Sequence, residues 1–121
     1  MTDPVRHLRD LPIEPVKAGT GTTRQLLTEP GAGAGFHIRR FVMEPGGGMP
    51  RHRNAIEHQQ YVVRGVARVG IGDETFRVEA GSVVHIPAGS AHWYTAEGGD
   101  EPFEFLCIVP DAPDRIELLE E

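Results

Sequence analysis

The sequence predicts an all-β domain, an antiparallel barrel or sandwich, from three observations. Between Thr22 and Val109, short runs of β-branched and aromatic residues alternate with Gly, Pro and Asp. The chain has 15 Gly and 10 Pro among 121 residues, and no collagen-like period orders them. No stretch before residue 110 carries apolar residues at helical spacing, which argues against βαβ architectures. Short strands separated by frequent turns are typical of sandwiches and barrels.

Eight runs are expected to form strands because turn residues bound each of them. They are Thr22–Thr28, Phe36–Glu44, His58–Arg64, Val66–Ile71, Thr75–Glu79, Val83–Ile86, Ala91–Thr95 and Phe103–Val109. The turns between them include the run 45–48 (Pro-Gly-Gly-Gly) and the pair 72–73 (Gly-Asp).

Alternation along a strand assigns its two faces. The residues that share one parity in the last strand are expected to face the core: Phe103, Phe105, Cys107 and Val109. The strand Phe36–Glu44 has mixed parity, which a bulge near residues 39–40 would reconcile. Residues 61–63 (Tyr-Val-Val) are apolar on both faces, so we expect a second subunit to cover the outer face in a homodimer.

The two ends differ from the middle in composition. Residues 1–21 are expected to be an extended arm, residues 22–110 the barrel, and residues 111–121 a short tail or helix. The segment Asp114–Glu121 has room for two helical turns, but its acidic end opposes the helix dipole, so a helix there would depend on docking.

Composition limits the classes of partner. A chain of 121 residues is one domain. Its net charge of −6 and its lack of a basic run argue against nucleic acid and an anionic membrane surface as partners. The single Cys107 excludes an internal disulfide framework. The first residues lack the apolar core of a signal peptide, so a cytoplasmic location is expected.

Three histidines lie in segments framed by Gly and Pro. His52 and Asn54 are two residues apart on a strand, so they point to one face, and His58 begins the next strand. His92 follows a Pro-Ala-Gly turn that returns the chain over the sheet. A barrel mouth lined by imidazoles is a plausible pocket for a small-molecule ligand.

The segments 46–65 and 81–96, which contain these histidines, resemble the two sequence motifs of the cupins. The first motif has the form G-x5-H-x-H-x(3,4)-E-x6-G, and its fixed positions are occupied by Gly46, His52, Asn54, His58 and Gly65. The second has the form G-x5-P-x-G-x2-H-x3-N, and it is matched by Gly81, Pro87, Gly89 and His92, with Ala96 in place of the asparagine. The resemblance covers about residues 36–109 and implies a cupin-type double-stranded β-helix, a jelly-roll barrel.

The resemblance also implies a site for one divalent transition metal. Its ligands would be His52, Asn54, His58 and His92, and the Glu57-His58 pair resembles small cupins with a four-histidine site. Asn54 either binds through its amide oxygen or leaves a coordination position open. Glu57 is expected to be the opposite-face neighbour of His58, in a salt bridge or in support of the site. A register slip of one residue would instead make Glu57 the ligand and turn His58 away. A barrel that has lost its metal is the competing interpretation, and Asn54 is its best support.

Imidazole ligands are neutral, so the ion would keep its double charge and attract carboxylates or enolates. Iron, manganese, copper, zinc and nickel all remain candidates. Gln60 shares the parity of His58, and Cys107 faces inward, so both are candidate pocket residues. Of the adjacent Arg39 and Arg40, one guanidinium inside the barrel would bind an anion, and Arg40 is the candidate pocket residue. A solvated strand face is the alternative explanation for both arginines.

The remaining histidines are interpreted as structural or exposed. His7 falls in that class, and His85 is expected to have a hydrogen-bonded core role. The residues around His37 form no motif that would assign it a role. Of Trp93 and Tyr94, one packs inside the barrel and one outside.

Two functions follow as expectations. The first is a metal-dependent enzyme acting on a small chelating substrate, with oxygen-dependent oxidation or cleavage favoured over isomerisation. The second is a non-catalytic module that binds or senses a small ligand, with or without metal, and the absence of a framed general base keeps it open.

Overall fold

The computed structural model describes residues 4–31 and 33–120, and in this part of the chain it is built from strands and one short 3-10 helix. The helix η1 spans Leu8–Asp10. The strands are β1 (Glu14–Pro15), β2 (Thr20–Leu26), β3 (Phe36–Asn54), β4 (His58–Arg64), β5 (Val66–Ile71), β6 (Glu74–Glu79), β7 (Val83–Ile86), β8 (His92–Ala96), β9 (Phe103–Pro110) and β10 (Ile116–Leu118). Every strand pairing is antiparallel. The all-β prediction is confirmed.

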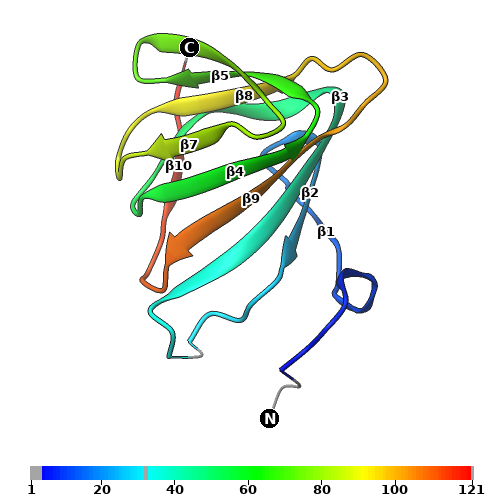
Figure 1. The fold of residues 1–121 in the computed structure, drawn as a ribbon. Coiled ribbons are helices and arrows are strands. Elements are labelled where there is room, and N and C mark those ends of the chain that lie inside the picture. The colour runs from blue at the N-terminus through cyan, green and yellow to red at the C-terminus, as the bar shows by residue number, and fades with distance from the viewer. Residues whose placement is uncertain (1–3, 32, 121) are drawn as a thin grey trace.

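The sheet curls into a barrel because β3 belongs to both of its halves (Figure 1). The first part of β3 lies between β2 and β9, and β4 and β7 continue that half. The last part of β3 lies between β8 and β10, and β5 and β6 continue the other half. The two inner faces therefore enclose one interior.

The Pro-Gly-Gly-Gly run that we expected to end a strand is instead a bend inside β3. Gly46 has a φ of 83°, which favours glycine. A side chain at Gly48 would collide with the backbone carbonyl of Tyr94 on β8. The glycines therefore let β3 pass close to β8 without ending, and this close passage carries the chain from one half of the barrel to the other.

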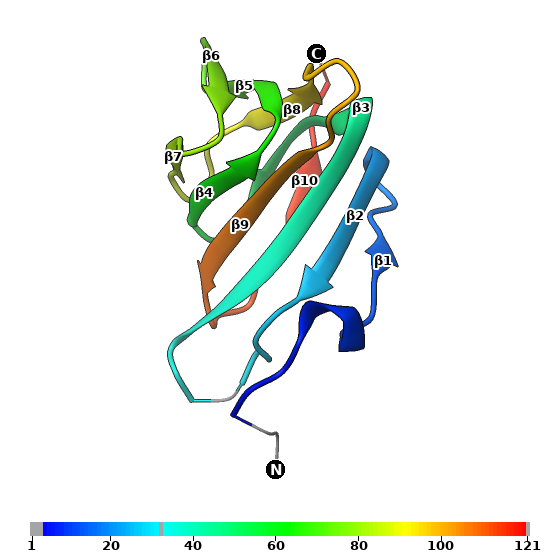
Figure 2. The same cartoon turned by 45° about the vertical axis from the view of Figure 1, so that its right-hand side comes forward.

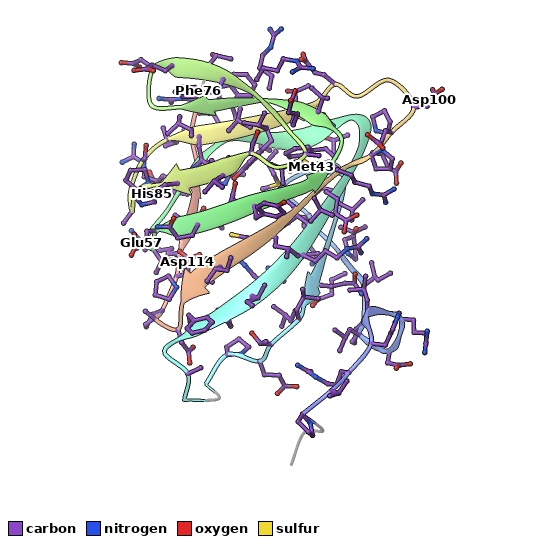
Figure 3. All side chains as sticks on the ribbon, viewed as in Figure 1. Met43, Glu57, Phe76, His85, Asp100 and Asp114 are labelled. Carbon is purple, nitrogen blue, oxygen red and sulfur yellow. The ribbon has the colours of Figure 1, made fainter. Side chains whose placement is uncertain are left out.

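The core follows the alternation of β9. Its inward residues Phe103, Phe105, Cys107 and Val109 are all at most 2% exposed, as the sequence predicted. Met43 of β3 is fully buried beside them, in the interior that Figure 3 shows between the strands. Burial of these apolar surfaces, at about 25 cal/mol per Å², is the main term that holds the two halves together.

The bulge expected near residues 39–40 is wrong. The pairing of β3 with β9 runs without a shift from Phe36↔Pro110 to Met43↔Phe103. Odd-numbered residues of this part of β3 face the interior, and Phe36 is 49% exposed. The mixed parity arises because the outer face of the strand also carries apolar residues, not because the strand changes register.

The N-terminal arm packs along β2, as Figure 2 shows. Glu14 pairs with Arg24 in register, so β1 is a short edge strand. The Gln25 side chain is buried and donates through Nε2 to the carbonyls of Leu8 and Leu11, at 3.1 and 3.2 Å. The arm is thereby held over the outer face of β2.

The prediction of a helix in the segment 114–121 is wrong within the described residues. Residues Ile116–Leu118 form β10, which pairs with His52, Arg53 and Asn54 of β3. The edge of β3 offers unpaired backbone groups there, and the segment satisfies them in an extended conformation. The acidic end that opposes a helix dipole has no such effect on a strand.

Apolar side chains lie on the outer face of β4 and β7. Tyr61, Val63 and Val83 are 48%, 40% and 78% exposed. This agrees with the apolar pattern that led us to expect a homodimer, and the dimer stays a prediction. Among the described residues, no helix has the length and apolar character needed to cross a membrane.

Candidate metal centre

A cavity of about 240 Å³ lies inside the curled sheet. Its walls come from β2, β3, β4, β8 and β9, from Val16 beside β1, and from Asp114 just before β10 and Ile116 at its start. His52, Asn54, His58, Gln60 and His92 all line it. The structure therefore brings together all four predicted ligands and one of the three predicted pocket residues.

The three imidazoles lie close to one another. His52 and His92 are register partners on β3 and β8, and their ring centroids are 4.1 Å apart. His58, at the start of β4, has its ring centroid 5.7 Å from that of His92. The three residues are between 1% and 6% exposed. Polar atoms buried to this degree normally have a hydrogen-bond partner or another ligand.

Backbone carbonyls orient two of these rings. His52 Nδ1 lies 2.7 Å from the carbonyl oxygen of Pro50, and His92 Nδ1 lies 3.0 Å from that of Ser90. A carbonyl only accepts, so in each ring Nδ1 carries the proton and Nε2 keeps its lone pair. This arrangement prepares an imidazole to bind a metal through Nε2. The Nε2 atoms of His58 and His92 are buried without a hydrogen-bond partner.

Asn54 is oriented in the same sense by a residue that the sequence did not reveal. Its Nδ2 donates to Asp114 Oδ2 at 3.1 Å. A carboxylate accepts only, so the amide has to turn its nitrogen toward Asp114 and its oxygen away. Asn54 Oδ1 is indeed buried without a partner.

Asp114 is itself held in place by the backbone. Its Oδ1 accepts hydrogen bonds from the amides of Ala55 and Arg115, at 2.9 and 2.7 Å. Figure 3 shows Asp114 at the end of the barrel where Glu57 and His85 lie, and Asp100 at the opposite end. Nothing local marks Asp114 as a site residue, because it reaches Asn54 only through the docking of β10.

The environment keeps the histidines neutral. Burial, followed by the charge of Arg39 and the two neighbouring imidazoles, lowers the pKa of His58 to about 3. Burial and then His52 lower the pKa of His92 to about 4, against opposing effects of the Ser90 carbonyl and Asp114. Burial also lowers the pKa of His52. Neutral imidazole is the form that binds metal.

Gln60 and Tyr94 form a polar pair in the wall of the cavity. Gln60 Nε2 donates to Tyr94 Oη at 2.8 Å. Burial raises the pKa of Tyr94, so the phenol stays protonated and its hydrogen is free to be donated to a ligand. Cys107 is fully buried and contacts Gln60 at 3.7 Å rather than lining the cavity. Burial raises the pKa of the Cys107 thiol.

The selection of Arg40 as the cavity arginine is wrong. Arg40 faces outward, where its Nε donates to Glu104 Oε2 at 2.7 Å and its Nη1 to Gln25 Oε1 at 2.6 Å. Arg39 lines the cavity instead. Because the pairing of residues 36–43 with β9 has no bulge, the parity of this part of β3 assigns the inward position to the odd-numbered residue.

The positions of Glu57, His85, Trp93 and Tyr94 in the structure decide the remaining predictions. Glu57 is exposed and pairs with His85 at 3.3 Å (Figure 3), so the register slip that would make Glu57 a ligand is not observed. His85 is exposed, and the core role expected for it is wrong. Tyr94 packs inside, with Trp93 on the opposite face of β8.

The other two histidines lie away from the cavity. His7 is exposed and caps η1 by accepting a hydrogen bond from the amide of Arg9. His37 is buried on β3 but does not line the cavity.

The donor atoms fit a transition metal. Across residues 4–31 and 33–120, no three His, Cys, Asp or Glu side chains are already arranged to hold an ion, so the imidazoles have to turn toward a common point to share one. Three buried atoms without a hydrogen-bond partner nevertheless belong to residues that line one cavity. They are Asn54 Oδ1, His58 Nε2 and His92 Nε2, and each could give a lone pair to a metal. Two imidazole nitrogens and an amide oxygen suit zinc, iron, nickel or copper.

Comparison with known proteins agrees with this architecture. The family model described as a cupin domain matches residues 39–109. A cupin-2 domain from Rhodospirillum rubrum superposes with a TM-score of 0.84 at 26% identity, over 100% of this chain and 82% of that one. The polyketide cyclase RemF from Streptomyces resistomycificus gives 0.82 at 30% identity, over 100% and 89%.

A cupin 2 domain-containing protein from Halorhodospira halophila gives a TM-score of 0.77 at 35% identity, over 83% of this chain and 71% of that one. No curated protein matches. The family model spans more than half of the sequence and covers both histidine segments, and the observed barrel is the one that the motifs implied. The chain belongs to the cupin family.

Proposed function

We propose that this cupin binds one divalent transition metal through Nε2 of His52, His58 and His92 and Oδ1 of Asn54. The observation that carries the proposal is the set of buried, unpartnered acceptor atoms on Asn54, His58 and His92 at one cavity. Each buried polar atom without a partner costs about 1–3 kcal/mol. A single ion would satisfy all of them together.

Asp114 is proposed as the residue that positions Asn54. It holds the amide nitrogen and so directs the oxygen toward the histidines. Its charge also opposes the lowering of the pKa of His52 and His92, so it acts at the site electrostatically. Since the four ligands are neutral, Asp114 supplies the negative charge that a divalent ion otherwise lacks there.

We further propose that the protein is an enzyme acting on a small chelating substrate, of carboxylate or enolate type. When bound, the metal would supply a Lewis acid that polarises the substrate oxygens. Tyr94 donates its phenolic hydrogen to the substrate, because Gln60 occupies the acceptor side of its oxygen. Oxygen-dependent oxidation or cleavage is the first candidate reaction, based on the neutral ligand set.

Oxygen-independent ring closure is the second candidate. It is favoured by the similarity to RemF, a polyketide cyclase, along the whole of this chain. Both candidates use an enolisable substrate, and they differ in their need for dioxygen.

A non-catalytic binding module is the alternative to both. Among the described residues that line the cavity, Asp114 is the one with a carboxylate, and both of its oxygens accept hydrogen bonds. It is therefore poorly placed as a general base, and this observation favours the binding module.

The first experiment measures metal content by plasma mass spectrometry on protein purified without added metal. We expect close to one metal per chain, or loading to that level with Zn²⁺. His92→Ala is expected to weaken Zn²⁺ binding by about 100-fold or more, and His85→Ala, which changes the exposed histidine, to leave it unchanged. Failure of the wild type to retain or take up metal would contradict the proposal.

A second experiment separates the reaction classes. Small β-diketones are incubated with the metal-loaded protein in air and without oxygen. Turnover only in air supports oxidation or cleavage, and turnover in both supports ring closure or isomerisation. Tight retention of a co-purified ligand with no turnover in either condition would favour the binding module.

A further inference from the structure

The Arg39 guanidinium is a cation in the cavity wall with no carboxylate partner. The register of β3 places it opposite Cys107 of β9, with its side chain toward the interior. Its Nη2 lies 3.5 Å from Cys107 Sγ, and its Nε is buried without a partner. In the described ranges 4–31 and 33–120, none of the ion pairs within 4.0 Å involves Arg39. Arg39 is partly buried, and charged groups withdrawn from water are rarely left without a partner.

A second guanidinium adds to the positive charge of this wall. Arg24 on β2 lines the same cavity, and its Nε is also buried without a partner. Its contact with Glu14 is 3.5 Å long and solvent-exposed, so this carboxylate neutralises it weakly.

An aromatic surface leads from Arg39 to the histidines. The guanidinium carbon lies 5.2 Å from the centre of the Phe41 ring. Phe41 stacks on Phe105 at 5.2 Å and 14°, and Phe105 stacks on Tyr94 at 5.4 Å and 15°. Tyr94 meets the His92 ring edge-on at 5.7 Å. A flat ligand that lies along these rings would reach Arg39 at one end and the histidines at the other.

The cavity is positive although the whole chain has a net charge of −6. A guanidinium presents a planar fork of donors that matches a carboxylate, and its strength increases away from water.

We propose that Arg39 is an anion subsite and that the ligand of this cavity is a small planar organic acid. Its carboxylate binds the Arg39 guanidinium, its body lies on Phe41 and Phe105, and an oxygen donor at its far end faces the histidines. The volume of about 240 Å³ equals that of about eight water molecules, which accommodates one substituted ring. The position of the far oxygen rests on the proposed metal function, and the role of Arg39 does not.

The test compares two compounds of nearly the same shape, 3,4-dihydroxybenzoate and its neutral amide, 3,4-dihydroxybenzamide. Calorimetric titrations are made with metal-free and with Zn²⁺-loaded protein. We expect the wild type to bind the acid about 10- to 100-fold more tightly than the amide in both forms. Equal affinity for the two, or no measurable binding of the acid, would overturn the proposal.

Variants then assign the preference to one residue. Arg39→Gln is expected to bind acid and amide alike, and Arg39→Lys to keep part of the preference because it keeps the charge. Arg68→Gln removes an exposed arginine on β5 and is expected to behave as the wild type. A preference that survives in folded Arg39→Gln would assign the anion to another group and overturn the proposal.

The two proposals fail in different ways. If no metal binds but the metal-free protein prefers the acid through Arg39, the metal function fails and the anion subsite stands. If Zn²⁺ binds and the acid has no advantage over the amide, the anion subsite fails and the metal function stands.

Discussion

Two polar clusters on opposite faces of the same strands differ in whether their hydrogen bonds are complete. On the outer face, Glu104 accepts from Arg40 at 2.7 Å and from Arg64 at 2.8 Å, and Arg40 also donates to Gln25. On the inner face, donor or acceptor atoms of Arg39, Asn54, His58 and His92 have no partner. Adjacent residues of β3, Arg39 and Arg40, belong to the two different clusters.

The difference separates structural from ligand-binding polar groups. A cluster whose members satisfy one another is complete without any other molecule, and it contributes to stability and to the arrangement of the strands. A buried cluster with several unsatisfied atoms is costly unless a ligand completes it. We therefore expect changes on the outer face to affect stability alone, and changes on the inner face to affect binding as well as stability.

Acid is expected to have the largest effect, through the inner cluster. In the folded protein the pKa of His58 is about 3 and that of His92 about 4, against about 6.5 in the unfolded chain. Below pH 6.5 the unfolded chain therefore gains protons that the folded metal-free protein does not. The free energy of unfolding of the metal-free protein should therefore fall by about 2 kcal/mol per imidazole between pH 7.5 and pH 5.

Chemical denaturation of the metal-free protein between pH 7.5 and 5 measures this loss. His85→Gln, on the outer surface, should leave the profile unchanged. A stability that stays constant across this range would contradict the neutral state of the buried histidines.

Asp114→Asn is expected to have the next largest effect. The new amide no longer requires Asn54 to present its nitrogen, and the negative charge at the site is lost. Zn²⁺ affinity should fall by about 10- to 100-fold, measured by competition with a chromophoric chelator.

Glu117→Gln is the matched control, because it removes one negative charge from an exposed position of β10. An Asp114→Asn variant with wild-type affinity and a wild-type melting temperature would show that Asp114 does not position Asn54.

Glu104→Gln should affect only stability. Burial raises the pKa of Glu104, but hydrogen bonds from Arg40 and Arg64 outweigh it and leave the pKa lowered, so the carboxylate stabilises the fold at neutral pH. Loss of its charge should cost about 1–3 kcal/mol, measured by urea denaturation. Zn²⁺ affinity should not change, and a tenfold change would contradict the separation of the two clusters.

Glu57→Gln is expected to have the smallest effect. The pair of Glu57 with His85 is more than half exposed on each side, and such pairs contribute about 0–1 kcal/mol. Metal content should be unchanged. Loss of metal in this variant would revive the register in which Glu57 is the ligand.

Local pattern predicted much of the barrel. The bounds of β4, β5 and β7 agree with the sequence prediction to the residue, because turn residues mark both ends of each strand. The inward faces of β9 also followed from alternation alone. The histidines were found because their spacing along the chain reproduces the two cupin motifs.

Long-range pairing was not visible in the same way. The Pro-Gly-Gly-Gly run reads as a turn, and only its close passage beside β8 makes it a bend within β3. The last strand is short and exposed, and what makes it a strand is the free edge of β3 beside it.

The sequence by itself determined the all-β class, the turns and the three histidines, since each depends on the order of neighbouring residues. Only the tertiary structure decided that Arg39 rather than Arg40 faces the cavity, because the unshifted pairing of residues 36–43 with β9 sets the parity of that part of β3. It also brought Asp114 to Asn54, 60 positions away in the chain. Contacts of that kind depend on which backbone edges remain to be paired once the barrel has closed, and no local pattern encodes them.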